Sequence, residues 1–445
     1  MNFKVIKFGG TSVGSPDRMK EVVRLINTDE PKIVVLSAVA GTTNKLAAIA
    51  SLLHKKQVEE ANTAINELHE EYKNFVSLFY SQTSTLKKAT NFIHAHFEYI
   101  RAFTQDMFTI HEENAILAQG ELLSTGLFHF HLQEEGINSA LISALEFMRV
   151  DKDHEPDEFY IKSNLRKELE KYPNTKLFIT QGYICRNIFG EISNLQRGGS
   201  DYSASIIGAA AEAYQIEIWT DIDGMHNNDP RIVTNTKPVR KLSFEEAAEL
   251  AYFGAKILHP ASVLPAQKAN IRVLLKNTME PQAEGTVISS EHKSKGITAI
   301  AAKDGITVIK IRSGRMLMAY GFLRKVFEVF ERYKTPIDMI TTSEVAVSLT
   351  IDNPTKINEI VAELSSFGSV EVDDNQSIIC VVGDMLAENK GYAFRVFESL
   401  KEISIRMISY GGSKNNVSFV VKSKDKNEAL IALHHGIFTT ETEPA

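Results

Sequence analysis

Short apolar runs alternate with longer amphipathic segments through roughly the first 290 residues of the chain. The apolar runs cover residues 3–8, 33–36, 177–180, 216–220 and 272–275. Uninterrupted runs of this length are typical of strands buried on both faces, and the spacing of residues 18–26 predicts a helix between two of them. The alternation predicts an α/β fold, with a largely parallel sheet sandwiched by helices.

A long helical pattern rich in Glu, Lys, Ala and Leu fills residues 45–108. It predicts a mainly helical excursion from the α/β fold, and its charged positions are expected to form a solvated face.

After about residue 295 the chain repeats itself. Gly321 and Val326 recur at one common spacing as Gly391 and Val396. Each copy predicts a strand, a helix that begins at the glycine, two strands joined by a turn, a helix and a strand. A copy of ~70 residues is short for an independent core, so the two α+β modules are expected to pack together. A duplicated structural module without a ligand is the alternative.

These patterns predict three domains. We expect a catalytic domain at residues 1–295, a first regulatory module at 296–374 and a second at 375–445.

Composition narrows the class of protein. The chain has 445 residues, of which 43% are hydrophobic and 24% charged, as in an ordinary globular protein. A net charge of −7 without long basic blocks disfavours a nucleic-acid partner. The N-terminal apolar run contains lysines and no apolar run approaches ~18 residues, which disfavours secretion and membrane spanning. Cys185 and Cys380 show no metal-type spacing, so we expect buried fillers and a cytoplasmic location.

The first candidate for chemistry is residues 7–14, KFGGTSVG, directly after the first predicted strand. Gly9 and Gly10 would let backbone N–H groups approach a phosphate, with Lys7 as a point charge beside them. The segment fits neither the Walker pattern nor G-x-G-x-x-G. A simple turn is the alternative.

The second candidate is residues 197–201, RGGSD, which lead into a helical run. A glycine pair at a helix N-terminus favours anions, and Arg197 can hold a carboxylate with two hydrogen bonds. Ser200 or Asp201 could instead serve only as an N-cap.

The third candidate combines residues 219–224 (WTDIDG), 229–231 (DPR) and 253–260 (FGAKILHP). Asp221 and Asp223 follow a buried strand, where the carboxyl ends of parallel strands line ligand crevices. They suit contacts to ribose, base or metal-bound water. Lys256 could bind phosphate, or could only complement a helix dipole.

Together these segments resemble the aspartate kinases of the amino acid kinase superfamily over essentially the whole chain. The resemblance is carried by residues 7–13, 37–44, 120–121, 197–201, 219–221 and 253–260. The chain is most similar to monofunctional, lysine-inhibited members, because it ends after two modules that look like ACT domains.

The resemblance implies ATP-dependent phosphorylation of the side-chain carboxylate of aspartate, the first step toward lysine, threonine and methionine. It implies catalytic roles for Lys7, Asp201 and Lys256. It places aspartate against Ser37, Thr43, Glu121, Tyr183, Arg197 and Ser200. It places the nucleotide against Lys7, Gly9, Gly10, Thr220, Asp221, Arg231 and Lys256. Mg²⁺ would be carried by ATP, and no metal held by the protein is expected.

Two departures from the family pattern affect the substrate loop. Gln196 ends the stretch Ser193-Asn194-Leu195-Gln196 where the family commonly has Thr-Thr-Leu-Gly, and Cys185 stands where glycine is usual.

The expected reaction needs no strong general base, because the carboxyl group of aspartate has a pKa near 3.9 and is ionised at neutral pH. The difficulty is repulsion between two anions, which Lys7, Lys256, the glycine turns and Mg²⁺ would offset. We expect Arg197 to hold the substrate α-carboxylate and Glu121 to contact its ammonium group.

The repeated modules suggest an amino-acid effector. Gly321 opens a predicted helix that suits a carboxylate, and Asp338 and Glu344 suit ammonium groups, which favours lysine over threonine. The resemblance implies an effector site of Met316, Ala319, Gly321, Asp338, Ser343 and Glu344. Ala319 and Pro336 replace residues that are usually polar. The family also implies a homodimer or a dimer of dimers.

Two other functions fit parts of the sequence. A kinase of the same fold could act on glutamate or N-acetylglutamate, but such relatives lack the helical insertion and the paired C-terminal modules. An amino-acid-sensing regulator with an inactive kinase half is disfavoured by the intact Lys7, Arg197, Asp221 and Lys256.

Overall fold

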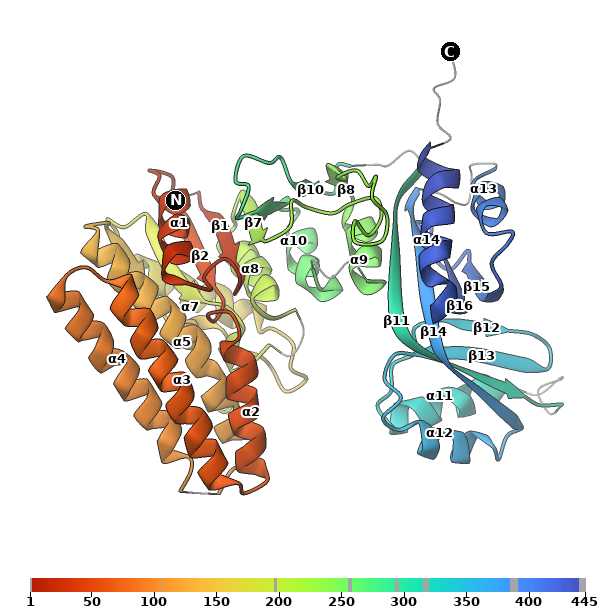
Figure 1. The fold of residues 1–445 in the computed structure, drawn as a ribbon, viewed down its shortest axis with the longest axis horizontal. Helices are drawn as coiled ribbons and strands as arrows, with labels where there is room; N and C mark the ends of the chain where they lie inside the picture. Colours follow the sequence, from red (N-terminus) through yellow and green to blue (C-terminus); the bar gives the residue numbers. More distant parts are fainter. Residues whose placement is uncertain are drawn as a thin grey trace, which may run out of the picture. The chain divides into compact units, whose positions relative to one another are not determined.

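The computed structural model describes residues 2–105, 107–195, 198–254, 258–292, 296–314, 320–384 and 391–439. The chain forms two compact units, each described by itself (Figure 1). The first comprises residues 1–225 and 257–291, and the second residues 226–256 and 292–445. None of the described helices has both the length and the apolar character that a membrane crossing requires.

The first unit is built on a sheet with the strand order β3-β4-β2-β1-β7-β9-β10. The strands are β1 (Lys4–Phe8), β2 (Lys32–Leu36), β3 (Ser139–Leu141), β4 (Leu177–Gln181), β7 (Gln215–Thr220), β9 (Val273–Asn277) and β10 (Thr286–Ile288). The strands β3, β4, β2, β1, β7 and β9 run parallel to one another, and β10 pairs antiparallel with β9. The parallel α/β sheet predicted from the apolar runs is confirmed.

The two faces of the sheet have different neighbours. On one face Ile6 and Phe8 join a large core with side chains of the surrounding helices. On the other, Gly208 of α8 (Gly199–Ala210) packs against Ile216, with Val5 nearby. Because side chains alternate along a strand, Lys7 shares the α8 face with Val5.

The predicted helical excursion is a bundle of α2 (Thr42–His54), α3 (Val58–Phe79), α4 (Thr83–Ala102) and α5 (Ile110–Glu134), whose helices lie side by side (Figure 1). Their apolar faces share one core with β1 and β2, so the bundle is an extension of the catalytic fold rather than a separate body. The remaining elements of this unit are α1 (Pro16–Ile26), α6 (Ala144–Phe147), α7 (Glu158–Glu170), the hairpin β5 (Ile184–Arg186) and β6 (Ile192–Asn194), η1 (Pro260–Val263) and α10 (Leu264–Lys268).

The second unit contains an antiparallel six-stranded sheet with the order β12-β13-β11-β14-β16-β15. The first copy supplies β11 (Gly296–Arg312), α11 (Phe322–Arg332), β12 (Ile340–Thr342), β13 (Ala346–Ile351) and α12 (Ile357–Leu364). The second supplies β14 (Ser369–Asp384), α13 (Tyr392–Ser399), β15 (Ile405–Tyr410), β16 (Asn416–Lys422), η2 (Ser423–Asp425), α14 (Lys426–His434) and the π-helix η3 (His435–Thr439).

The long strands β11 and β14 pair along their length and join the two copies into one sheet. Gly321 and Gly391 are the N-cap residues of α11 and α13, both with positive φ, as expected for glycines that begin equivalent helices. The predicted packing of the copies against each other is therefore present.

Residues 226–256 belong to the second unit, although they precede the repeated modules. This segment contains β8 (Lys241–Leu242) and α9 (Phe244–Tyr252), and α9 packs against β11 and β14. After α9, Gly254 adopts a φ of +124°, and a Cβ there would meet the carbonyl oxygen of Ala302 at 1.9 Å. Only glycine allows this approach. The domain boundaries after residues 295 and 374 stay predictions.

Candidate functional site

The carboxyl ends of the central strands meet at one edge of the parallel sheet. The N–H of Gly9 donates a 3.2 Å hydrogen bond to the carbonyl of Trp219, and the N–H of Ser37 donates a 3.2 Å bond to the carbonyl of Phe8. These bonds fix the turn after β1 between the ends of β7 and β2. Ligand crevices of parallel sheets form at such an edge.

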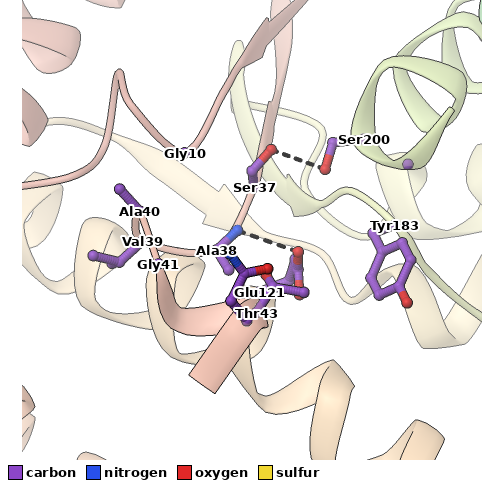
Figure 2. Close-up of a pocket in the computed structure, with 12 residues that line it drawn as sticks. Gly10, Ser37, Ala38, Val39, Ala40, Gly41, Thr43, Glu121, Tyr183 and Ser200 are labelled. Atoms are coloured by element: carbon purple, nitrogen blue, oxygen red, sulfur yellow. Dashed lines mark hydrogen bonds between the residues drawn. The ribbon is translucent and has the colours of Figure 1, made fainter. Parts of the chain in front are cut away.

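A pocket of about 330 Å³ opens beside this edge. It is lined by Gly10, Ser37, Ala38, Val39, Ala40, Gly41, Thr43, Asn44, Glu121, Tyr183, Gly199 and Ser200, and Figure 2 shows most of them. The first residues of α2 and α8 both belong to this lining. Free N–H groups at two helix N-termini make the pocket suitable for anionic groups.

Lys7 is the buried cation of the site. It is 8% exposed, and its Nζ lies 2.6 Å from Oδ1 of Asp201 in the first turn of α8. A Cβ on Gly9 would lie 3.4 Å from the same Nζ, so the glycine turn runs directly past the ammonium group. The structure therefore joins the two predicted glycine segments through an ion pair.

A second link between these segments is formed by two hydroxyl groups. Ser37 Oγ donates a 2.9 Å hydrogen bond to Ser200 Oγ across the pocket (Figure 2). Gly182 makes the approach of Ser200 possible, because a Cβ at residue 182 would lie 2.4 Å from the Ser200 Cβ. Both hydroxyl groups are held in place by the backbone around them.

Glu121 is the buried acidic residue that lines the pocket. It is 3% exposed; Oε1 accepts a 3.2 Å hydrogen bond from the N–H of Ala38, and Oε2 has no partner among the described residues. Gly120 allows α5 to come this close, since a Cβ there would lie 2.9 Å from the Ala38 side chain. Burial raises the pKa of Glu121 to about 8. A carboxylate in this state favours a cationic ligand.

The ring of Tyr183 forms another wall of the pocket (Figure 2). Tyr183 has a φ of +65°, an uncommon value for a residue other than glycine. Its N–H donates a 2.8 Å hydrogen bond to Ser203 Oγ, and its carbonyl accepts one from the N–H of Leu195. Burial raises the pKa of Tyr183 to about 12, so the phenol is neutral.

Thr220 and Asp221 lie at the carboxyl end of β7, immediately after the Trp219 carbonyl that binds the first glycine turn. The Thr220 carbonyl accepts a 2.8 Å hydrogen bond from the N–H of Thr278. The Asp221 carboxylate is exposed there.

Some predicted site residues lie elsewhere or cannot be placed. Arg197 and Lys256 lie outside the described residues. Arg231 belongs to the second unit, where its guanidinium binds both carboxylate oxygens of Asp229 at 2.9 and 2.7 Å. Any contact of Arg231 with a nucleotide would compete with this ion pair.

The predicted effector residues that the structure describes lie in the second unit. Gly321 begins α11, and Ser343 and Glu344 lie in the exposed turn between β12 and β13. Asp338 has a nearly buried side chain and is bound by Lys303 and Tyr252. Met316 and Ala319 fall outside the described residues.

Sequence reasoning missed two contributors to the pocket. The N–H of Ala38 orients Glu121, and the Asn44 side chain is part of the lining. Asn44 is the last residue of the motif at residues 37–44, so its role could have been predicted from the sequence. The N–H of Ala38 could not, because every residue except proline has a backbone N–H. Cys185 and Cys380 are both buried, as expected for fillers.

Comparison with known proteins now fixes the family. The model of the amino acid kinase family matches residues 2–277, and an ACT domain model matches residues 379–436. Lysine-sensitive aspartokinase 3 of Escherichia coli is 33% identical over 98% of this chain and 99% of its own length. The chain belongs to the aspartokinase family.

Other aspartokinases agree with this assignment. Aspartokinase 3, chloroplastic, of Arabidopsis thaliana is 35% identical over 98% of this chain and 82% of that protein. The crystal structure of E. coli aspartokinase III with aspartate and ADP, an R-state, is 31% identical with a TM-score of 0.81, covering 98% of this chain and 100% of that one. The T-state complex with lysine and aspartate is 32% identical with the same TM-score, covering 98% and 99%. The family and fold predictions are confirmed.

Proposed function

We propose that this chain transfers the γ-phosphoryl group of ATP to the side-chain carboxylate of L-aspartate and forms 4-phospho-L-aspartate and ADP. The observation that carries the proposal is Oε2 of Glu121, which has no partner in the part of the chain that the structure describes and lies in a pocket bounded by a glycine turn and two helix N-termini. An amino acid with an ammonium group and two carboxylates matches this pocket, because the ammonium group would favour the ionised form of Glu121 and the anion-binding elements suit the carboxylates.

The charges of the site suit this chemistry. The attacking carboxylate is ionised at neutral pH, so the protein must mainly position two anions in line and spread the charge that develops between them. Lys7 and the N–H group of Gly10 are assigned to the phosphates, and Gly9, whose own N–H is bonded to the Trp219 carbonyl, lets the turn pass close to Lys7. In the free enzyme Asp201 neutralises Lys7 and keeps it beside the turn.

Mg²⁺ would enter with ATP and neutralise phosphate charge. Asp221 offers an exposed carboxylate at the end of β7, beside the glycine turn, and suits contact with the water shell of the ion. Ser37, Thr43, Tyr183 and Ser200 are assigned to aspartate because they line the pocket around Glu121.

The test is an acyl phosphate assay. ATP would be supplied with aspartate, with glutamate or with neither, and hydroxylamine would trap the product. We expect hydroxamate only with aspartate, and a fall in turnover of at least about 100-fold in Lys7→Ala, as for other single electrostatic contributors.

The matched control is Lys4→Ala. Lys4 lies on the same strand at its amino end, where it pairs with Glu30 and Glu217. Near-normal turnover in Lys7→Ala, or equal product with glutamate, would contradict the proposal and favour a relative that acts on another carboxylate.

Lysine is the proposed effector, because a lysine complex is known for the E. coli relative and Asp338 in the second unit has a buried carboxylate oxygen without a partner among the described residues. Gly321, Asp338, Ser343 and Glu344 are the described residues assigned to it. Calorimetric titration should show lysine binding without threonine binding. No heat at millimolar lysine would contradict this assignment.

We further propose a homodimer or a dimer of dimers in the cytoplasm. The family resemblance supports the assembly, and two unpaired buried cysteines fit a reducing compartment. Light scattering that finds only monomer would contradict the assembly.

A further inference from the structure

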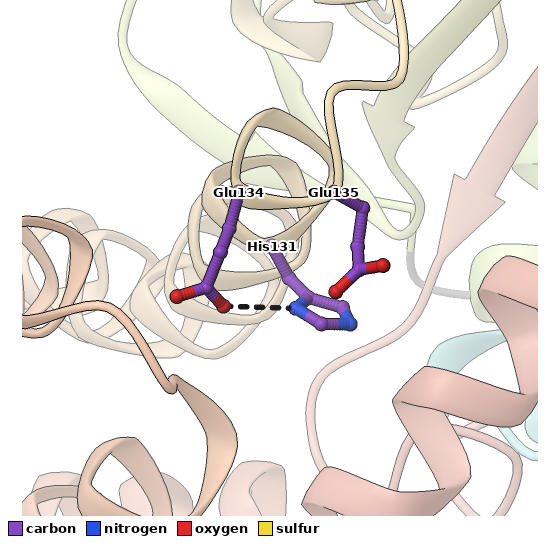
Figure 3. A group of neighbouring side chains, drawn as sticks. All are labelled: His131, Glu134 and Glu135. Carbon is purple, nitrogen blue, oxygen red and sulfur yellow. Dashed lines mark ion pairs between the residues drawn. The ribbon is translucent and has the colours of Figure 1, made fainter.

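A second pocket of about 350 Å³ lies in the first unit, away from the kinase site. It is lined by Lys20, Val23, Arg24, Leu78, Phe79, Tyr80, Ser81, His131, Glu134 and Glu135. The last three side chains come from the C-terminal end of α5, and Figure 3 shows the two carboxylates on either side of the imidazole.

We propose that His131, Glu134 and Glu135 bind a divalent transition-metal ion of the zinc type. Residues three and four positions apart share one face of a helix, so the backbone already brings these groups together. One ligand atom from each residue lies within 4.8 Å of the other two, and this is the one such group among the described residues.

The imidazole supplies the first argument. His131 is 5% exposed, and its Nδ1 is buried without a hydrogen-bond partner among the described residues. A buried nitrogen in this state costs free energy unless a ligand binds it. Phe79, whose ring centroid lies 4.5 Å away, limits rotation of the imidazole.

The distance between the first two groups supplies the second argument. Nδ1 of His131 lies 3.4 Å from Oε2 of Glu134, which is an ion-pair distance (dashed line in Figure 3) but does not meet the geometry of a hydrogen bond. Two ligands at about 2.0–2.1 Å from a tetrahedral zinc ion lie about 3.4 Å apart. The pair is thus spaced as two ligands of one ion are.

Hydrogen bonds to its other carboxylate oxygen also orient Glu134. Its Oε1 accepts hydrogen bonds from the N–H groups of Ser81 and Gln82, at 3.1 and 2.6 Å, at the N-terminus of α4. This leaves Oε2 directed at His131. Partners of this kind commonly hold metal-binding carboxylates in place.

Charge supplies the last argument. Glu134 and Glu135 lie at the C-terminal end of a 25-residue helix, where the helix dipole disfavours carboxylates and a cation would offset the cost. Lys20 and Arg24 line the same pocket, but neither forms an ion pair with these carboxylates among the described residues. With zinc bound, the three side chains and the ion are neutral together, and the two cations favour an anionic fourth ligand.

The test is calorimetric titration of Zn²⁺ into the full chain, freed of metal with a chelator, without nucleotide or Mg²⁺. We expect one site with micromolar or tighter affinity. Glu135→Gln should weaken binding at least tenfold, and His131→Gln should abolish it. Glu67→Gln, an exposed change on α3, is the matched control and should leave binding unchanged.

Co²⁺ offers a second readout, because a tetrahedral site gives a visible absorption band that the two ligand variants should lose. Glu135 is exposed, so its variant should fold even if His131→Gln does not. No zinc binding at millimolar concentration, or equal affinity in the wild type and Glu135→Gln, would overturn the proposal. This site is independent of the kinase proposal, since neither readout measures activity.

Discussion

The hydroxyl group of Tyr252, at the end of α9, donates a 2.7 Å hydrogen bond to Oδ1 of Asp338. Lys303 Nζ lies 2.9 Å from the same oxygen, whereas Oδ2 is buried without a partner among the described residues. Asp338, which is assigned to the effector ammonium group, therefore has one carboxylate oxygen bound by two donors and a second oxygen without a partner among the described residues. Through Tyr252 it also connects to the segment of residues 226–256.

Asp338→Asn separates the charge of this residue from its hydrogen bond. The amide oxygen can still accept from Tyr252, but the negative charge that attracts the lysine ammonium group is lost. We expect the lysine concentration for half-inhibition to rise at least about 30-fold, the lower end for loss of a buried charge partner. Basal turnover without lysine should change little.

Tyr252→Phe is the complementary change, since it removes the hydrogen bond and keeps the charge. Lysine inhibition should stay within about threefold of the wild type. If Tyr252→Phe abolished inhibition and Asp338→Asn did not, the ammonium group would not bind at Asp338.

Glu121→Gln should impair aspartate binding selectively. Losing a buried partner of the ammonium group costs about 2–5 kcal/mol, so we expect KM for aspartate to rise at least about 30-fold while KM for ATP changes little. Succinate, which lacks the amine, supplies the control in a competition assay. The wild type should prefer aspartate strongly over succinate, and the variant should lose most of this preference. An unchanged preference would remove Glu121 from ammonium recognition.

The raised pKa of Glu121 also predicts a pH dependence of stability. Its carboxyl group has a pKa of about 8 in the folded chain and an ordinary value of 4.5 in the unfolded chain. Between these values the folded state binds the extra proton, so this group lowers stability as pH rises, by about 1.4 kcal/mol per pH unit. Glu121→Gln should therefore gain stability relative to the wild type between pH 6 and pH 8.

Urea unfolding followed by tryptophan fluorescence measures this difference. The chain has one tryptophan, Trp219 in β7, so the signal reports on the first unit. A difference between the two proteins that stays constant from pH 6 to pH 8 would show that Glu121 titrates normally.

Gly182→Ala should displace Ser200. The added Cβ would lie 2.4 Å from the Ser200 Cβ and 2.8 Å from its Cα, so a flexible side chain cannot absorb the clash. We expect a loss of about 1–3 kcal/mol in the free energy of unfolding and weaker aspartate binding. Ser200→Ala, which removes only the hydroxyl group, should weaken binding with less loss of stability. Equal stability of the two variants would contradict the steric argument.

The strands of the catalytic fold could be predicted closely from the sequence. Residues 33–36 were expected as a strand, and β2 covers Lys32–Leu36. The prediction succeeds because short continuous apolar runs are typical of strands in a sheet that is covered on both faces. The approach of the two glycine turns could not be derived in this way, because the second turn follows β6, a strand of an antiparallel hairpin outside the parallel sheet.

Other features depended on information that single residues do not carry. Phe244–Tyr252 reads clearly as a helix with a capping box, but its apolar face does not reveal that it packs against β11 and β14. The ion pair between Lys7 and Asp201 joins residues far apart in sequence. The group at His131 was not predicted, because a histidine and two glutamates at helical spacing are also typical of a solvated helix face.

The chain passes from one unit to the other three times, since residues 226–256 and 292–445 together form the second unit. A single proteolytic cut therefore cannot release an intact kinase fragment. A truncated gene ending at residue 295 would encode α9 without the strands that cover its apolar face, and the product should expose that face and aggregate. The proposed regulation by lysine should therefore be removed by point substitutions rather than by shortening the chain.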